Sequence, residues 1–201
     1  MDHRIHISGS DASGIARAPG SVETNAGVPC FVDFEASSLA ARSYPIEVAW
    51  TNRHGRIVSH VISPAGIDEW TDWSPSAERI HGLSRRDLLQ QGLAPADVAA
   101  RLAQDLDGRV IFTDSPQFDG FWLARLFSAA GRSLPGVVID HIDSLVCEAL
   151  GVAPQALDPA VMARLKARAR LQIQGQHRAA LDVAYLMRVW LNALESVRAV
   201  G

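Results

Sequence analysis

The sequence has few cysteines, little net charge and no long hydrophobic run. Two cysteines, Cys30 and Cys147, occur among 201 residues, which excludes a disulfide framework and is typical of reduced core residues in a cytosolic protein. A net charge of −3 argues against non-specific wrapping of nucleic acid, although a local basic groove is compatible with it. No apolar run reaches the roughly 20 residues of a transmembrane helix, and the N-terminus lacks the apolar stretch of a signal peptide. We therefore predict a cytoplasmic protein without membrane contact.

What remains is the composition of one folded domain with a tail. Hydrophobic residues make up 48% of the chain and charged residues 20%, which is typical of a globular protein with a sizeable core. Residues 1–28 are rich in Gly, Ser, Ala and Asp and show no periodicity, so we predict a disordered N-terminal tail there. The folded domain is predicted at residues 29–197.

Hydrophobic periodicity predicts strands in the first half of this domain and mostly helices in the second. Apolar runs predict five strands, at residues 31–39, 45–52, 56–63, 109–113 and 136–140. The first three follow one another with short connections, which indicates an antiparallel meander. Ser74 and Ser84 are predicted to cap two short helices, and Gly131 to end a longer one. Further helices are predicted at residues 96–106, 144–150, 159–171 and 177–196.

The first strand carries an unusual pair of acids. Within Phe31 to Leu39, the alternation of a strand places Asp33 and Glu35 on one face. Two neighbouring carboxylates on so apolar a strand repel each other and are costly to bury. They predict a positive charge between them, and a divalent cation is the usual one. The alternative interpretation is a strand edge whose acids face solvent.

Two helices each begin their apolar stripe with an aspartate. In the helix that contains Leu123, one turn back along the stripe lies Asp119. In the last helix, one turn before Leu186 lies Asp182. An acid in the first turn of a helix is common because it interacts favourably with the helix dipole. That explains its position along the helix but not its place on the inward face.

Four inward carboxylates in one chain indicate a site for hard cations. If they meet, they can hold two divalent ions such as Mg²⁺ or Mn²⁺. Two such ions can activate a water molecule and stabilise the leaving oxygen in phosphodiester cleavage. His177 lies five residues before Asp182, where a helix is predicted to start. An imidazole that titrates near neutrality is a natural base for the attacking water.

Three segments resemble the exonuclease motifs of the DEDDh family of 3′–5′ exonucleases, which includes proofreading subunits, RNase T and oligoribonuclease. They are FVDFE, FTDSPQFD and HRAALD, in this order, and all three together form a specific signal. Asp33 and Glu35 match the first motif, Phe118 and Asp119 the second, and His177 and Asp182 the third. The segment IHGLS, residues 80–84, is similar to one found between the first two motifs of relatives. Departures from the family pattern are Ser115, where relatives often have Asn, and Ser38, where they often have Gly.

The resemblance implies a fold and an activity. The implied fold is α/β and RNase H-like, with a mixed five-stranded sheet of three antiparallel and then two parallel strands, flanked by helices. The implied enzyme is a phosphodiester hydrolase of the EC 3.1 type that removes 5′-mononucleotides from the 3′ end of single-stranded nucleic acid. Two Mg²⁺ or Mn²⁺ ions are expected as cofactors, with His177 as the general base. The implied metal ligands are Asp33, Glu35, Asp119 and Asp182.

Substrate contacts are expected around the first two motifs. Backbone groups at Ala36, Ser37 and Ser38 are predicted to bind the terminal sugar. Leu39 either packs against the terminal base, as in relatives, or belongs to the core. Ser115 and Phe118 are further candidates beside the second motif.

Other polar and aromatic residues have alternative interpretations. The basic residues of segment 159–171 either track phosphates or form a solvated helix face. Trp70 and Trp73 either stack on bases or pack into the core. The carboxylates Asp114, Asp140 and Asp143 are predicted to have turn or capping roles, and the alternative for Asp140 or Asp143 is a contact that supports a metal ligand. His81 is predicted to pack beside the glycine that ends a helix, and His54, His60 and His141 to be structural or exposed.

The sequence leaves the choice of partner open. Single-stranded DNA and RNA 3′ ends are both expected substrates, because the choice depends on contacts to the 2′-hydroxyl. A homodimer is compatible with the sequence, since free-standing relatives commonly dimerise. The alternative function is a catalytically silent module with the exonuclease fold that binds nucleic acid or a protein partner.

Overall fold

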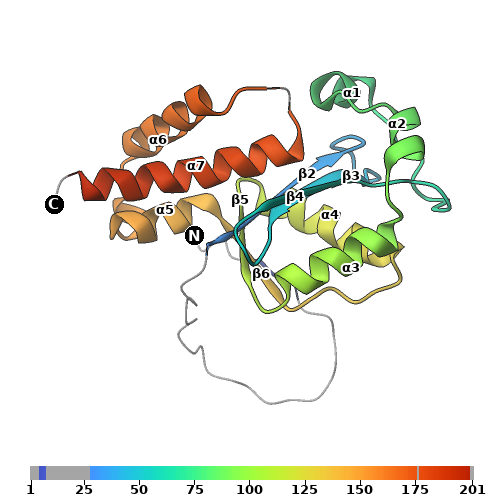
Figure 1. Cartoon of the computed structure of the whole chain (residues 1–201), viewed down its shortest axis with the longest axis horizontal. Helices are drawn as coiled ribbons and strands as arrows, with labels where there is room; N and C mark the ends of the chain where they lie inside the picture. The colour runs from blue at the N-terminus through green and yellow to red at the C-terminus, as the bar shows by residue number, and fades with distance from the viewer. Residues whose placement is uncertain (1–4, 8–27, 176, 200–201) are drawn as a thin grey trace, which may run out of the picture.

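The computed structural model describes residues 5–7, 28–175 and 177–199 of the chain (Figure 1). This part of the chain contains a mixed β-sheet. Among these residues the sheet has six strands in the order β1-β6-β5-β2-β3-β4. Strands β2, β3 and β4 form an antiparallel meander, and β5 and β6 run parallel to β2. The strands are β1 (Ile5–Ile7), β2 (Cys30–Ala36), β3 (Pro45–Thr51), β4 (Ile57–Val61), β5 (Val110–Thr113) and β6 (Val137–His141).

Helices cover the sheet, and those of the C-terminal third gather together beside it (Figure 1). Local caps start several of them: Ser74 and Ser84 each accept a hydrogen bond from the first turn of α1 and α2, and Ser84 forms a full capping box with Asp87. The helices are α1 (Pro75–His81), α2 (Arg85–Gln91), α3 (Pro95–Leu106), α4 (Pro116–Ala129), α5 (Ile142–Leu150), the short 3₁₀ helix η1 (Pro154–Ala156), α6 (Pro159–Gln172) and α7 (Ala179–Arg198).

Two hydrophobic cores form, and the alternation of β2 separates them. Val32 and Phe34 belong to the core that also contains the buried residues of α3 and α4. Phe31 belongs to the other core, which α5, α6 and α7 complete. Because side chains two positions apart share a face, Asp33 and Glu35 project on the side of Phe31. The two acids therefore face the layer that contains α7.

The register of the parallel strands brings distant segments together at one edge of β2. Phe31 pairs with Phe112, so the end of β5 reaches the level of Val32 and Asp33. Helix α4 begins two residues after β5 ends. The first turn of α4 is thereby fixed beside the acids of β2. Just beyond them, the β2–β3 register shifts between Glu35 and Ala36, and the regular ladder ends.

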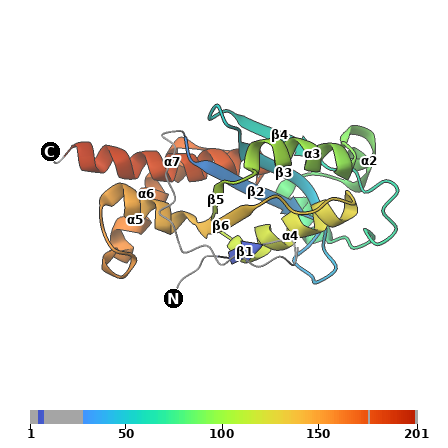
Figure 2. The ribbon, with the colours of Figure 1, turned by 90° about the horizontal axis from the view of Figure 1, so that it is seen from below.

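The five predicted strands and their directions are confirmed, and the structure adds a sixth. Strand β1 pairs antiparallel with β6 through Ile5–Ile7, beside α4 as Figure 2 shows. This corrects the prediction of a disordered tail at these residues, where three alternating positions are too few to reveal a strand. The rest of the predicted tail up to residue 27 lies outside the described residues. Among the described helices, none is both long and apolar enough to cross a membrane.

Candidate active site

Asp33, Glu35 and Asp182 come together from β2 and α7. Each offers a carboxylate oxygen, and these oxygens all lie within 4.8 Å of one another. We call these three residues the carboxylate cluster. Asp182 reaches it from the first turn of α7, where its backbone N–H donates to the Arg178 carbonyl at 3.1 Å. All three side chains are half-buried, which leaves them open to an ion or a substrate from one side.

Asp119 adjoins the carboxylate cluster from α4 and is almost fully buried. Its side chain is 2% exposed, and it accepts hydrogen bonds from the hydroxyl of Thr113 and the backbone N–H of Phe34. The charge of Asp119 raises the pKa of Asp33, so the two carboxylates are electrostatic neighbours. The structure thus brings Asp33, Glu35 and Asp182 together, and Asp119 lies beside them, held by hydrogen bonds.

Burial and mutual repulsion disfavour the charged form of these acids when no cation is bound. Burial, followed by the charges of Asp119, Asp182 and Glu35, raises the pKa of Asp33 well above its usual value. Burial and then the charges of Asp182 and Glu47 raise the pKa of Glu35 to about 8, against an opposing effect of Arg178. Burial raises the pKa of Asp119 to about 8, although the Thr113 hydrogen bond opposes it.

The cluster fits a divalent cation chemically. Its donors are carboxylate oxygens, which are the ligands that Mg²⁺ and Mn²⁺ prefer. A divalent ion among them would favour the charged form of each acid and cancel the repulsion that raises their pKa values. The arrangement can therefore hold hard cations, and a substrate oxygen that bears negative charge can share them.

His177 lies at the open side of the site. It is exposed. Burial raises the pKa of Asp182, and the charge of His177 opposes this rise without cancelling it. The helix does not begin at His177 as predicted: it begins at Ala179, with Arg178 as the N-cap residue. The start is later because Arg178 is extended and its neighbour Ala179 finds an acceptor on another strand. The role of His177 as general base stays a prediction.

Two features near the site were missed by the sequence-based predictions. Asp114 follows β5 directly, and its charge raises the pKa of Asp33, Asp119 and Asp182. The signal for it was present, because a residue at the end of β5 must lie beside the start of α4. The second feature is the buried Glu47, which binds Arg178 through two hydrogen bonds.

The acids Asp140 and Asp143 make local contacts, in agreement with the turn or capping roles predicted for them. Asp140 accepts hydrogen bonds from the His141 backbone and the Ser144 hydroxyl. Asp143 lies 3.2 Å from the His141 ring nitrogen Nδ1 and 3.4 Å from Lys166 Nζ.

Three of the predicted substrate contacts, Ala36, Ser37 and Ser38, lie at the end of β2 and in the loop that follows it. Ala36 and Ser37 are buried, and the hydroxyls of Ser37 and Ser38 both donate to Asp72. Leu39 is 75% exposed, which excludes its assignment to the core. A free apolar side chain thus projects from the loop that follows the acids.

The remaining predicted contacts lie at the start of α4. Ser115 is exposed as the N-cap residue, and its carbonyl accepts from the N–H groups of Phe118 and Asp119. Phe118 is 45% exposed and stacks on Trp122 at 5.5 Å between ring centroids. Its free face points away from that stack.

Trp70 and Trp73 both make contacts within the protein. Trp70 is buried and stacks on Tyr44. Trp73 donates its indole N–H to Glu78. Trp70 is therefore not available to stack on a base.

The basic residues of α6 divide between ion pairs and exposed positions. Lys166 lies beside Asp143 and Arg168 pairs with Glu195. Arg170 lies over the ring of Tyr185, and its charge partly opposes the rise in the pKa of Asp182 that burial causes. Of the basic side chains on this helix, Arg170 is thus the one with a described electrostatic link to the carboxylate cluster.

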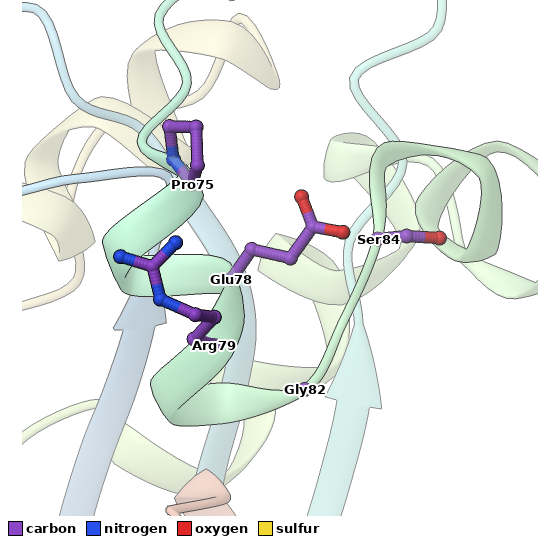
Figure 3. Close-up of a pocket in the computed structure, with 5 residues that line it drawn as sticks. All are labelled: Pro75, Glu78, Arg79, Gly82 and Ser84. Atoms are coloured by element: carbon purple, nitrogen blue, oxygen red, sulfur yellow. The ribbon is translucent and has the colours of Figure 1, made fainter.

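Two hollows occur near these elements. A groove of about 1460 Å³ opens between the start of α4 and the segment from α5 to α6, lined among others by Asp114, Ser115, Phe118 and His141. A smaller hollow of about 490 Å³ lies between α1 and the start of α2, and none of its lining residues belongs to the carboxylate cluster (Figure 3). Of these two hollows, the groove is the one that includes predicted site residues.

No family model matches the sequence, and no curated protein matches it. The structure is similar to E. coli exonuclease I in complex with a dT13 oligonucleotide, with a TM-score of 0.61 and 18% identity over 85% of this chain and 42% of that one. For the same enzyme with a dA16 oligonucleotide the TM-score is 0.60, at 18% identity over 85% and 41% of the two chains. For exonuclease I from Methylocaldum szegediense it is 0.56, at 19% identity over 85% and 42%.

This chain therefore spans about two fifths of the length of the exonuclease I chains. The likeness shows that the chain has the fold of exonuclease I, and the predicted α/β fold with three antiparallel and two parallel strands is confirmed.

Proposed function

We propose that this chain is a metal-dependent 3′–5′ exonuclease that hydrolyses the 3′-terminal phosphodiester of single-stranded nucleic acid and releases 5′-mononucleotides. The observation that carries the proposal is the carboxylate cluster, whose three acids offer oxygens within 4.8 Å in the fold of exonuclease I. Asp119 adjoins this cluster and His177 borders it. A purely structural domain would have no reason to gather acids whose repulsion costs it stability.

In this proposal Asp33, Glu35, Asp119 and Asp182 hold two Mg²⁺ or Mn²⁺ ions. Such ions supply a water molecule of lowered pKa and stabilise charge on the leaving oxygen. The residues themselves have distinct tasks. Asp119 is fixed by Thr113 and the Phe34 N–H, so it sets the position of the site against β2. Asp182 is half-exposed and faces the side from which water and substrate enter.

His177 acts as the general base. An imidazole nitrogen of its exposed ring accepts a proton from the attacking water as the water oxygen forms its bond to phosphorus. The bond between phosphorus and the 3′ oxygen of the preceding nucleotide breaks. One 5′-mononucleotide leaves, and the shortened strand keeps a free 3′-hydroxyl after protonation from solvent.

Single-stranded DNA is the substrate that we propose first. The neighbouring exonuclease I structures contain dT13 and dA16 oligonucleotides. Leu39, in the loop after β2, and Phe118, in the first turn of α4, offer exposed apolar surfaces, against which bases can pack. The groove beside α4 offers room for the preceding nucleotides. We place the activity in the cytoplasm, which the two free, buried cysteines support.

Digestion of a 5′-labelled single strand tests the proposal. With Mn²⁺ the purified chain should produce a ladder of products that shortens from the 3′ end, and chelation of the metal should stop it. Asp33→Ala should abolish the ladder, whereas Asp68→Ala, at an exposed acid, should not. If the wild-type chain forms no ladder, or if Asp33→Ala cuts equally well, the proposal is wrong. Stabilisation by Mn²⁺ without any cleavage would instead favour a silent binding module.

A further inference from the structure

Glu47 is a buried acid next to the site that the proposed reaction does not use. It lies on β3 directly opposite Glu35 of β2, so the two side chains project from the same face of the sheet. The Glu47 side chain is 2% exposed. A glutamate at this depth is costly unless partners satisfy its charge and both of its oxygens.

Four donors satisfy the Glu47 carboxylate. Arg178 donates from Nε to Oε2 at 2.8 Å and from Nη2 to Oε1 at 2.7 Å, which is a bidentate pair. The backbone N–H of Ala179 donates to Oε2 at 3.2 Å, and the Ser59 hydroxyl to Oε1 at 3.1 Å. The carboxylate thus links β3, β4 and the start of α7.

The start of α7 depends on this contact for a cap. Its N-cap residue is Arg178, which makes no side-chain capping hydrogen bond. The first N–H groups of a helix lack partners within the helix, and a negative charge near them is favourable. Glu47 supplies both the acceptor for Ala179 and the charge, from a strand 132 residues away in sequence. It therefore acts as a remote cap of α7.

The residue at which α7 begins decides where the catalytic groups lie. His177 is the neighbour of Arg178, and Asp182 follows one turn later through the hydrogen bond from its N–H to the Arg178 carbonyl. If the pair between Glu47 and Arg178 opens, the guanidinium loses both of its hydrogen bonds to the sheet, and the charge of Glu35 remains as an attraction without fixed geometry. A displacement of about 1 Å at such a site can cost a factor of 10² in rate.

We infer that Glu47 and Arg178 form a positioning pair, which fixes His177 and Asp182 relative to the acids of β2. The inference rests on the proposed function, since it assigns these two residues to the same site. Neither residue is a metal ligand or a base in it. A pair that served only to stabilise the fold would affect the melting temperature and leave the rate of the folded enzyme unchanged.

The Glu47→Gln variant of the full chain tests the inference against a matched control on α7. Glu195→Gln is that control, because Glu195 also contacts two arginines, at 2.7 and 3.0 Å, but is 41% exposed and far along α7. With Mn²⁺ and a labelled single strand, we expect Glu47→Gln to lower kcat about 100-fold per folded molecule with little change in KM. Glu195→Gln should keep both values. A Glu47→Gln enzyme with wild-type kcat overturns the inference.

A second variant decides the matter if Glu47→Gln does not fold. Arg178→Lys keeps the positive charge but cannot form the bidentate pair, so we expect a partial loss of kcat, about tenfold. Wild-type kcat in Arg178→Lys would contradict the inference.

A metal titration separates failure of the inference from failure of the proposed function. If the wild-type chain does not cleave, the proposed function fails, and Mn²⁺ affinity becomes the readout. It should fall about tenfold in Glu47→Gln and not in Glu195→Gln. Equal affinity in all three proteins, or no Mn²⁺ binding by the wild type, overturns the inference.

Discussion

Helices α4 and α7 each place an aspartate at the same position of their first turn, but they hold it differently. Asp119 and Asp182 both donate their backbone N–H to the carbonyl of the N-cap residue four positions earlier. Asp119 is almost fully buried and accepts from Thr113 and from the β2 backbone. Asp182 is half-exposed, and the charges of His177 and Arg170 act on it.

The segments before the two helices explain this difference. Helix α4 follows β5 after two residues, so the sheet itself fixes its start. Helix α7 follows a longer connection from α6, and its start is held by Glu47 from another strand. The α4 side of the site is therefore a fixed reference, and the α7 side carries the groups that must meet water and substrate. The proposed two-metal reaction needs both kinds of support.

Loss of Asp119 or of Asp182 should lower activity more than any other change considered, and by a similar factor on the two helices. Asp119→Asn and Asp182→Asn each remove a metal ligand of the proposed site, which is worth several kcal/mol in the transition state. We expect kcat/KM for Mn²⁺-dependent cleavage to fall roughly 1,000-fold or more in each. Asp68→Asn, at an exposed acid, is the control. Activity within tenfold of wild type in one of the two variants would remove that helix from the metal site.

Loss of the proposed base on the α7 side should lower the rate of cleavage and leave metal binding unchanged. His177→Ala should lower kcat about 100-fold or more, because general base catalysis typically contributes that much. Mn²⁺ affinity should stay unchanged, since His177 is not a ligand in this proposal. His54→Ala, at an exposed histidine in the β3–β4 turn, is the matched control. If His177→Ala cleaves as fast as the control, another group takes the proton.

The sequence predicts the acids on β2 and α4 better than it predicts the start of α7. Asp33, Glu35 and Asp119 follow from local patterns, namely the alternation of a strand and the apolar stripe of a helix. Both patterns hold because short-range geometry decides which way these side chains point. The start of α7 was placed two residues early because its cap is Glu47, which no pattern near His177 can reveal.

Tertiary packing explains the other failures. Glu47 alternates with Ile46 and Val48, a pattern that usually marks a solvent-facing position, yet all of β3 is buried because α7 covers its second face. Asp114 was assigned to a turn, but the pairing of β5 with β2 places its charge beside the acids. Strand β1 depends on the exposed edge of β6 and not on a periodicity of its own.

The pH dependence of stability should differ between the two sides in the metal-free protein. Folding raises the pKa of Asp119 and of Glu35 from near 4 to about 8, so the folded state binds more protons than the unfolded state between these values. The free energy of folding that these two raised pKa values contribute is fully present below about pH 4 and is lost as the pH rises to about 8. From pH 5 to pH 8 we therefore expect the melting temperature to fall by roughly 10 °C or more.

Mn²⁺ and two variants sharpen this measurement. Mn²⁺ should reverse the loss at pH 8, because it favours the charged acids. Asp119→Asn should remove more of the pH dependence than Asp182→Asn, since its carboxylate is more buried. A metal-free melting temperature that stays level or rises from pH 5 to pH 8 would contradict the raised pKa values. Thermal melts in chelator across this range provide the measurement.

The smallest expected effect concerns the hydrogen bond that fixes the α4 side. Thr113→Val keeps the size of the side chain but removes the hydroxyl that donates to Asp119. Groups that orient metal ligands typically contribute a factor of 10 to 100 in affinity, and Asp119 keeps its second donor at Phe34. We therefore expect Mn²⁺ affinity to fall about tenfold in a calorimetric titration, with Thr71→Val at an exposed threonine as the control. Equal affinity in both variants would show that the sheet backbone alone fixes Asp119, and the contrast between the two helices would then rest on burial and not on hydrogen bonding.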